Sequence, residues 1–363
     1  MPADDLAKDR PERSSEELLA LIREHGAGVI RDHWVVRVPT NQPSWTSTGV
    51  NLKAGDGISL FCFGRAWPEA NPSAWMGAHF GLRMRTSAEN PPFRACRGSL
   101  TFTVEASGEL QTVNAFPWVD QTGALASSAQ IDDRVAGGFE LLIILWQVDP
   151  QAGLMRLGAG DGPAAKEFAA ELAALRNPMR TPPGWNYRWE TGDAEAFEAT
   201  EDGAIGCEIA DDAAILQKPI SAPLTPETRL RWSWKVDRLA SEEAEDSLAN
   251  HDYVSIAVEF DNGQDLTYVW SAALDPEFSY RCPIPSWRNR ETHLVIRSGG
   301  ADLGRWITEE RGVLRDYQRA VGAPPARIVA VWLIAVSVFQ HGVARAEYRN
   351  IELCRGSELM RVI

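Results

Sequence analysis

The 363-residue sequence lacks the signatures of several large functional classes. Its five cysteines are scattered without a C-x-x-C spacing, which argues against a disulfide framework or a cysteine zinc site and favours buried thiols in a reducing compartment. The six histidines never occur at zinc-ligand spacing. H-E-x-x-H, Walker and G-x-S-x-G patterns are also missing. We therefore expect no metal, no cofactor and no serine-hydrolase chemistry.

Positive charge and long apolar runs are scarce as well. Lysine and arginine total 36 against 50 acidic residues, which gives a net charge of -14. Without a basic stripe, a nucleic-acid partner or an anionic membrane surface is not expected. The apolar stretch 328–338 is about half the length that spans a bilayer, so we predict a buried strand there. Residues 1–10 contain no apolar signal core, which predicts a cytoplasmic protein.

Tryptophan, by contrast, is abundant. The fourteen tryptophans fall beside Gly, Pro and Asp turns or on short alternating strands, as at Trp45, Trp75, Trp232 and Trp234. Indole rings in such places can form stacking surfaces for a sugar or an aromatic ligand, or they can fill the core of a β-sandwich. The sequence leaves both interpretations open for each ring, and it supports a binding cleft better than a named reaction.

Alternating strands separated by glycine-rich turns predict a mainly β fold of two antiparallel, jelly-roll-like β-sandwiches. Ser14 to Glu24 has the Ser-Ser-Glu-Glu start of a capping box and predicts a short amphipathic helix. Gly162 to Arg176 consists largely of helix formers, and a further helix is expected from about Glu309 to Arg319. The predicted domains are an N-terminal helical segment (1–33), a first sandwich (34–150), a helical linker (151–182) and a second sandwich (183–363).

The first sandwich carries Trp45-Thr46-x-Thr48-Gly49-Val50, Ala54-Gly55-Asp56, Trp75-x-Gly77 and Ser107-Gly108-x-Leu110. With these motifs it resembles the galactose-binding-like module related to bacterial galactophilic lectins. The resemblance implies a sugar held through calcium by side chains near the last turns. The acidic and amide residues of that region are Asn114, Asp120, Asp132 and Asp133. They do not supply the six to eight oxygen ligands that calcium takes.

The second sandwich carries Lys235-Val236-x-Arg238-Leu239, Tyr268-Val269-Trp270, Ile296-Arg297-Ser298-Gly299 and Gly304-Arg305-Trp306. With these motifs it resembles the bacterial domain-of-unknown-function family 3047. The resemblance implies a jelly-roll sandwich and supplies no activity. Where members carry an acidic run after the last apolar strand, this chain has residues 337–341, Ser-Val-Phe-Gln-His, which suggests a changed reaction or none.

Alternation also sorts side chains by face in the segments 230–237 and 251–260. The predicted core faces comprise Leu230, Trp232, Trp234, Val236, Val254, Ile256, Val258 and Phe260. The opposite faces carry Arg231, Ser233, Lys235, Asp237, His251, Tyr253, Ser255 and Glu259. A polar face of this kind is either solvated or forms the wall of a cleft.

The cleft interpretation predicts general acid-base chemistry, with Lys235, Tyr253 or His251 within reach of Glu259 or Asp237. The predicted catalytic residues are Lys235, Glu259, Tyr253 and His251. The predicted substrate-binding residues are Tyr268, Trp270, Arg297, Arg305, His341 and Trp75. The two arginines could clamp a carboxylate or a developing oxyanion, or could form structural ion pairs.

Two functions remain open. The first is a metal-independent lyase, hydrolase or isomerase that acts on a glycoside or an oxygenated aromatic small molecule. The alternative is a non-catalytic carbohydrate-binding or assembly protein. Both predict a small-molecule or glycan ligand and neither predicts a nucleic-acid or membrane partner. Uncovered sheet edges make a homodimer reasonable.

Overall fold

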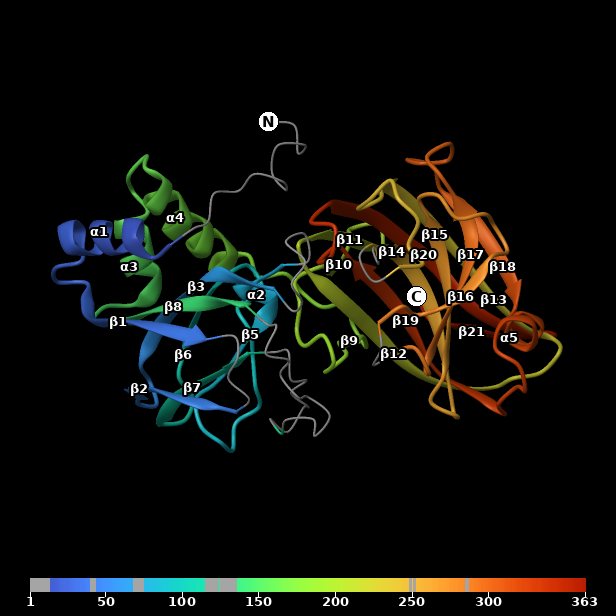
Figure 1. Ribbon diagram of the computed structural model, residues 1–363, viewed down its shortest axis with the longest axis horizontal. Coiled ribbons are helices and arrows are strands. Elements are labelled where there is room, and N and C mark those ends of the chain that lie inside the picture. The colour runs from blue at the N-terminus through green and yellow to red at the C-terminus, as the bar shows by residue number, and fades with distance from the viewer. Residues whose placement is uncertain are drawn as a thin grey trace. The chain divides into compact units, whose positions relative to one another are not determined.

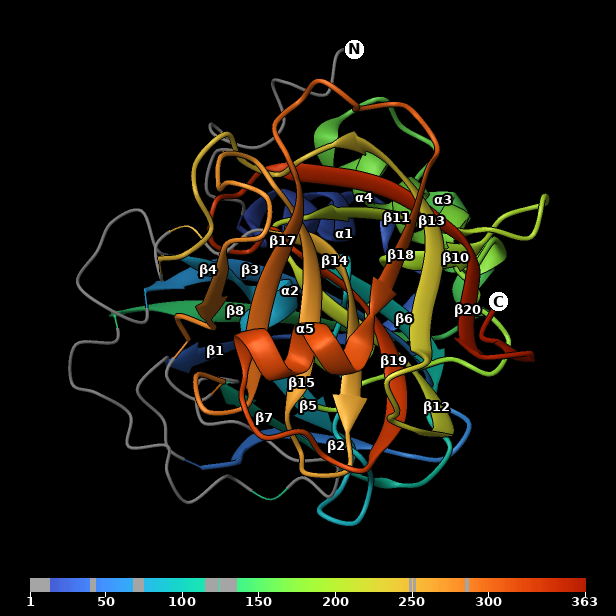
Figure 2. The same ribbon diagram turned by 90° about the vertical axis from the view of Figure 1, so that its right-hand side faces the viewer.

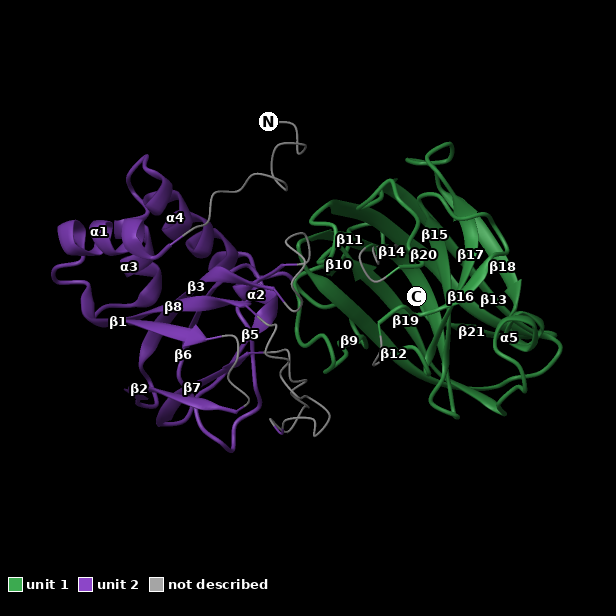
Figure 3. Ribbon diagram, viewed as in Figure 1, with its two compact units in different colours: residues 1–8, 180–363 green, residues 9–179 purple. Residues whose placement is uncertain are grey.

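The computed structural model describes residues 14–39, 44–67, 75–114, 124, 136–247, 250, 253–284 and 287–363. These residues form two compact units that meet in sequence between Met179 and Arg180 (Figure 3). Both units are built mainly from β-sheets, and the few helices are short (Figure 1). The prediction of a mainly β protein with β-sandwich domains is therefore confirmed.

Two sheets form the N-terminal unit. The larger has the order β1-β8-β3-β4 with β6 also paired to β3, and the smaller has the order β2-β7-β5. The strands are β1 (Ile30–Pro39), β2 (Thr46–Leu52), β3 (Gly57–Trp67), β4 (Met76–Gly77), β5 (Leu82–Arg85), β6 (Ser99–Thr103), β7 (Gly108–Asn114) and β8 (Ala136–Trp146). Leu60 on β3 and Leu110 on β7 lie in the core cluster that both sheets share.

Helices cover the other face of the larger sheet (Figure 1). They are α1 (Glu16–His25), α3 (Pro150–Leu157) and α4 (Pro163–Arg176), while the single turn α2 (Ala78–Gly81) precedes β5. Alternation along β3 turns Phe61 toward these helices, where its ring meets Phe168 edge-on with a centroid separation of 5.1 Å. The segment assigned to a linker thus belongs, as far as Met179, to the N-terminal unit.

Both helices predicted before residue 180 are present. The start of α1 differs from a capping box, because the Ser15 side chain makes no cap hydrogen bond. The Ser15 backbone N–H instead donates to Glu140 Oε1 on β8 at 3.0 Å. A side chain of the sheet therefore satisfies a backbone donor at the start of this helix.

The C-terminal unit is a sandwich of two larger sheets. The seven-stranded sheet has the order β16-β17-β15-β14-β19-β12-β9, and the six-stranded sheet has the order β10-β11-β20-β13-β18 with β21 paired to β20. The strands are β9 (Asn186–Tyr187), β10 (Phe197–Ala199), β11 (Ile205–Ala210), β12 (Ala213–Pro223), β13 (Thr228–Arg238), β14 (Tyr253–Phe260), β15 (Asp265–Ser271), β16 (Ser279–Arg281), β17 (Glu291–Ser298), β18 (Ile307–Gly312), β19 (Arg327–Val336), β20 (Val343–Arg355) and β21 (Glu358–Arg361).

Aromatic side chains fill the core between these sheets. Trp232 on β13 stacks on Tyr268 of β15 at a centroid separation of 5.3 Å. The eight residues predicted as core faces are all buried there. Helix α5 (Val313–Ala320) is labelled in Figure 2. It adds Val313 and Tyr317 to the same core. It begins later than predicted because residues 307–312 pair with β13 as a strand.

Candidate functional site

Carboxylates line up across the outer face of the seven-stranded sheet, the face turned away from the aromatic core. In the strand register Glu291 of β17 lies opposite Asp265 of β15, which lies opposite Glu259 of β14. Asp265 and Glu291 are almost fully buried, and so are the neighbouring Ser255 and Thr267. Among the side chains that the structure describes on the polar face of β14, Ser255 is therefore covered and Glu259 is partly exposed, so this part of the face is not simply solvated.

Two arginines neutralise the accessible end of this row. Arg188 donates to Glu190 at 2.7 and 3.1 Å and to Glu259 at 3.1 Å. Arg290 donates to Glu190 at 2.8 Å and lies 3.7 Å from Glu259. We call Arg188, Glu190, Glu259 and Arg290 the ionic network. Each of its carboxylates faces two guanidinium groups.

Tryptophans lie beneath the ionic network. The Arg188 guanidinium lies 4.2 Å from the centre of the Trp332 indole, and that of Arg290 lies 4.6 Å from the centre of Trp287. The two indoles meet edge-on at 6.5 Å. Both rings are buried, so they support the arginines and present no open stacking surface.

The protonation of these carboxyls does not suit acid-base catalysis. Burial acts to raise the pKa of Glu190. The hydrogen bonds and charge of Arg188 outweigh this effect and lower the pKa, so Glu190 stays ionised. Burial and the negative charge of Glu291 raise the pKa of Asp265 well above its usual value. Asp265 has no exposed surface, however, and cannot reach a ligand. A general acid needs contact with its substrate.

The outer face of the six-stranded sheet is more open. Along β13 the residues turned outward include exposed Arg231 and partly exposed Lys235. Lys235 hydrogen-bonds Glu347 of β20 and lies 3.5 Å from Asp237. The hydrogen bond to Glu347 raises the pKa of Lys235, against the effect of burial. Lys235 is thus a permanent cation over the physiological pH range.

Trp306 lies beside this cation. It comes two residues after Gly304, which has a left-handed φ of 75°. The Gly304 N–H donates to the carbonyl of Val236 at 2.8 Å and so holds the loop against β13. The indole is partly exposed. Arg349 of β20 stacks on the ring at 3.8 Å from its centre, and Lys235 Nζ lies 5.8 Å from the same point. We call Trp306, Lys235, Asp237, Glu347 and Arg349 the Trp306 surface.

Two further predicted residues form ion pairs with acidic residues that precede and follow Trp306 in the sequence. Arg297 donates to Glu309 at 2.7 Å and to Asp302 at 3.2 Å. Arg305 is exposed and lies 3.8 Å from the same Asp302. Both arginines therefore form the ion pairs that were the alternative to a ligand clamp.

The structure does not bring the predicted acid-base pair together. Lys235 and Glu259 lie on the outer faces of different sheets, with the aromatic core between them. The other pairing considered, Lys235 with Asp237, is present. Tyr253 is the first residue of β14, and His251 lies outside the described residues.

The remaining predicted ligand contacts are dispersed. Tyr268 and Trp270 are buried in the aromatic core and line no cleft. His341 pairs through Nδ1 with Asp211 at 3.0 Å. Trp75 belongs to the N-terminal unit, where the Arg65 guanidinium lies 3.9 Å from the centre of its ring. Of the residues considered for calcium, Asn114 is buried on β7 and the other three lie outside the described residues.

Sequence reasoning missed Arg188, Glu190, Arg290, Trp306 and Arg349. Arg188 and Glu190 follow the two-residue strand β9, and Arg290 precedes β17, so none of the three lies within a strand where a period-two pattern assigns a face. Trp306 stood in a noted motif, Gly304-Arg305-Trp306, and a tryptophan after a glycine turn was a signal that could have singled it out.

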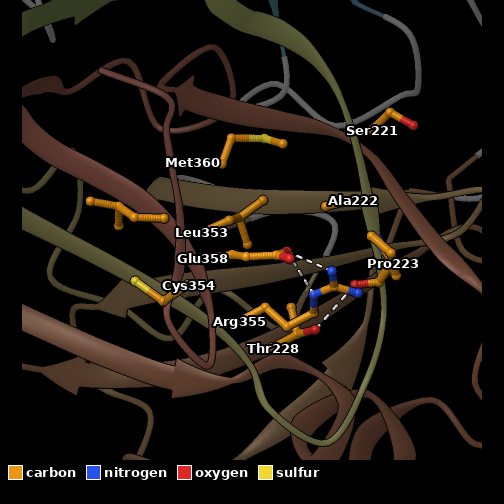
Figure 4. Close-up of a pocket in the computed structure, with 10 residues that line it drawn as sticks. Ser221, Ala222, Pro223, Thr228, Leu353, Cys354, Arg355, Glu358 and Met360 are labelled. Carbon is orange, nitrogen blue, oxygen red and sulfur yellow. Dashed lines mark hydrogen bonds and ion pairs between the residues drawn. The ribbon is translucent and has the colours of Figure 1, made fainter.

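A separate pocket of about 230 Å³ opens at the end of the sandwich where β12, β13 and the β20–β21 hairpin meet (Figure 4). Arg355 and Glu358 form an ion pair beside it. Burial and nearby acidic charge raise the pKa of the Cys354 thiol, so it is a poor nucleophile. The lining residues are Ser221, Ala222, Pro223, Thr228, Leu353, Cys354, Arg355, Glu358, Leu359 and Met360.

No three His, Cys, Asp or Glu side chains among the described residues are arranged to hold a metal ion. None of the described helices is long and apolar enough to cross a membrane.

Most of the C-terminal unit is covered by one family. Residues 186–352 match the family described as "Protein of unknown function (DUF3047)". This confirms the resemblance inferred from the motifs of the second sandwich. Among curated proteins, no sequence match was found.

Three solved structures show low similarity to the chain. The "EclA N-terminal domain; PllA-like lectin" is 21% identical and covers 32% of this chain and 97% of its own, with a TM-score of 0.25. The xyloglucanase domain of NopAA from Sinorhizobium fredii, in complex with cellobiose, is 9% identical, covers 48% and 94%, and has a TM-score of 0.32. A carbohydrate-binding module of the β-sandwich superfamily is 7% identical, covers 88% and 98%, and has a TM-score of 0.24. Similarities this low carry no conclusion about what this chain binds.

Proposed function

We propose that the C-terminal unit binds a carbohydrate without catalysis, at the Trp306 surface. The observation that carries this proposal is a partly exposed indole surrounded by charged side chains on the open face of a sandwich. On the opposite sheet Trp270, Trp332 and most polar groups are buried. A ligand in solution can therefore reach Trp306 but not Trp332.

The chemistry of the Trp306 surface suits a sugar. A pyranose ring has an apolar C–H face that packs against an indole, and hydroxyl groups that need hydrogen-bond partners at its rim. Lys235 and Glu347 hydrogen-bond each other, so donors and acceptors are already in place beside the ring. Side chains fixed in this way lose little conformational entropy when a ligand binds.

Binding is favoured over catalysis by the protonation of Lys235 and the position of Glu259. A general base must give up its proton near neutral pH, and the raised pKa of Lys235 prevents that. Glu259 lies on the other sheet and is held by two arginines. Lyase or hydrolase activity on a glycoside stays a prediction that the same samples can test.

The experiment is a glycan array probed with the full chain, followed by calorimetric titration of the strongest ligand. Trp306→Ala should weaken binding at least about tenfold, which corresponds to about 1.4 kcal/mol. The matched control is Trp189→Ala, because Trp189 is 41% exposed and lies outside the Trp306 surface. Incubation of the same ligand with the protein should release no new reducing ends.

Two results would overturn the proposal. The first is that no glycan on the array binds the wild-type chain. The second is that Trp306→Ala binds as tightly as Trp189→Ala, which would place the site elsewhere. Turnover of the ligand would instead restore the enzymatic interpretation.

A further inference from the structure

The cations around Trp306 differ in whether they have an acidic partner. Lys235 is held by Glu347 and Asp237, and Arg297 by Glu309 and Asp302. Arg349 stands apart. Within the described ranges no carboxylate lies within 4.0 Å of its guanidinium, which is the ion-pair distance its neighbours meet.

The Arg349 guanidinium also has an unused donor. Its Nε atom is shielded from solvent and has no hydrogen-bond partner among the described residues. The hydrogen bond from the Thr200 hydroxyl is the largest cause that lowers the pKa of Asp202, and the positive charge of Arg349 adds a smaller effect. Arg349 and Asp202 nevertheless do not form an ion pair. Arg231 also lacks an ion pair, but it is exposed and water solvates it.

We propose that the ligand of the Trp306 surface is an acidic sugar whose carboxylate binds Arg349, a proposal that rests on the proposed carbohydrate function. A guanidinium presents a planar fork of N–H donors that matches a carboxylate, and such charge-assisted hydrogen bonds are stronger than neutral ones. The guanidinium lies 3.8 Å from the centre of the Trp306 ring, which places the fork beside the indole. A uronic acid joins the required carboxylate to a ring that can pack on the indole.

The neighbouring side chains set the direction of such a ligand. Lys235 is neutralised by Glu347 and Asp237, which would repel a second carboxylate at that end. Beside Arg349 in the strand register is Ser233, whose hydroxyl is 2.8 Å from that of Thr308. The carboxylate is thus expected at the Arg349 end of the surface and the neutral hydroxyls of the sugar toward Lys235.

The test is calorimetric titration of the full chain with trisaccharides of galacturonic, glucuronic and mannuronic acid. Each acid is matched by its methyl ester, which removes the charge and keeps the ring. The wild-type chain should bind at least one acid at least tenfold more tightly than its ester. Arg349→Gln should bind acid and ester alike, near the wild-type affinity for the ester. Arg345→Gln, which alters an exposed arginine on the same strand and face, should retain the preference.

The outcomes separate this inference from the proposed function. If the acids and esters bind equally, or only neutral glycans bind, the carboxylate assignment is wrong while carbohydrate binding stands. If a sulfated galactose trisaccharide binds more tightly than the acids, the group bound by Arg349 is a sulfate, and the carboxylate assignment is again wrong. If Arg349→Gln still prefers the acid to its ester, Arg349 does not bind the carboxylate. If no saccharide binds at all, both proposals fail.

Discussion

Arg349 stacks its guanidinium 3.8 Å from the centre of the Trp306 indole, on the open face of the six-stranded sheet. The same contact occurs on the other sheet, where Arg188 lies 4.2 Å from Trp332. The two stacks differ in their surroundings. Arg188 is held by two carboxylates above a buried ring, whereas Arg349 has no acidic partner among the described residues and its ring is partly exposed. The first contact is enclosed in the fold, whereas both residues of the second are partly exposed.

Removal of Arg188 should destabilise the C-terminal unit strongly. Arg188→Ala leaves Glu190 and Glu259 facing a single remaining guanidinium at a nearly buried site, and the loss of one partner from a buried ion pair costs about 3–5 kcal/mol. Chemical denaturation at neutral pH measures the change. The control, Arg345→Ala, breaks an exposed pair with Glu208 and should cost less than about 1 kcal/mol. Equal effects of the two variants would contradict a structural role of the ionic network.

The stability of the chain should depend on pH through Asp265. Its folded-state pKa is raised above the ordinary 3.8 by burial and by Glu291, so the folded chain keeps a proton that the unfolded chain has lost. This contribution is complete below about pH 3.8 and disappears as pH rises through the folded-state value. Glu190, whose pKa is lowered, acts in the opposite sense and loses its contribution as pH falls.

Asp265→Asn isolates the first of these two effects. The amide keeps an oxygen for the Thr267 hydroxyl, which lies 3.1 Å from Asp265 Oδ1, and it cannot ionise. The Tm of this variant minus that of the wild type should therefore increase from pH 4 to pH 8. Glu190 is present in both proteins and cancels in the difference. Parallel Tm curves would show that Asp265 has no shifted pKa.

The two units should respond separately to a core substitution. Phe168 of α4 is buried against Phe61, so Phe168→Ala removes a large ring from the N-terminal unit and should destabilise that unit by about 3–5 kcal/mol. Differential scanning calorimetry should show one transition moved to lower temperature and a second unchanged. An equal shift of both transitions would mean that the units unfold together.

Trp232 and Trp189 represent the two fates of tryptophan in this chain. Trp232 is fully buried between the sheets, and Trp232→Ala should cost about 3–5 kcal/mol in denaturation. Trp189 is exposed, and Trp189→Ala should change stability by no more than about 0.5 kcal/mol. A comparable loss in both variants would place Trp189 in a packed environment that its exposure does not suggest.

The sequence predicted the core well because period-two alternation reports which side of a strand is apolar. It identified Trp232, Trp234 and the apolar face of β14 from this signal alone. Alternation does not report which sheet a strand joins. Lys235 and Glu259 both point away from the core, but strand order places them on opposite sides of the sandwich. That order depends on long-range pairing, which one sequence does not reveal.

The candidate site was harder to predict for a related reason. Arg349 lies on a strand with a recognisable pattern, but its distinguishing property is the lack of an acidic neighbour across β13 and β18. Trp306 is brought to Arg349 by a loop that Gly304 holds against β13. Charge pairing between strands and loop placement are both tertiary properties. The motif Gly304-Arg305-Trp306 marked the place without showing its neighbours.

The most direct test of carbohydrate binding at Trp306 is a crystal structure of the full chain grown with its tightest-binding oligosaccharide. The account predicts one sugar ring packed against the Trp306 indole, with polar atoms of the sugar within hydrogen-bond distance of Lys235, Glu347 or Arg349. A sugar bound on the N-terminal unit, or over the ionic network of the seven-stranded sheet, with Trp306 left uncovered, would contradict it.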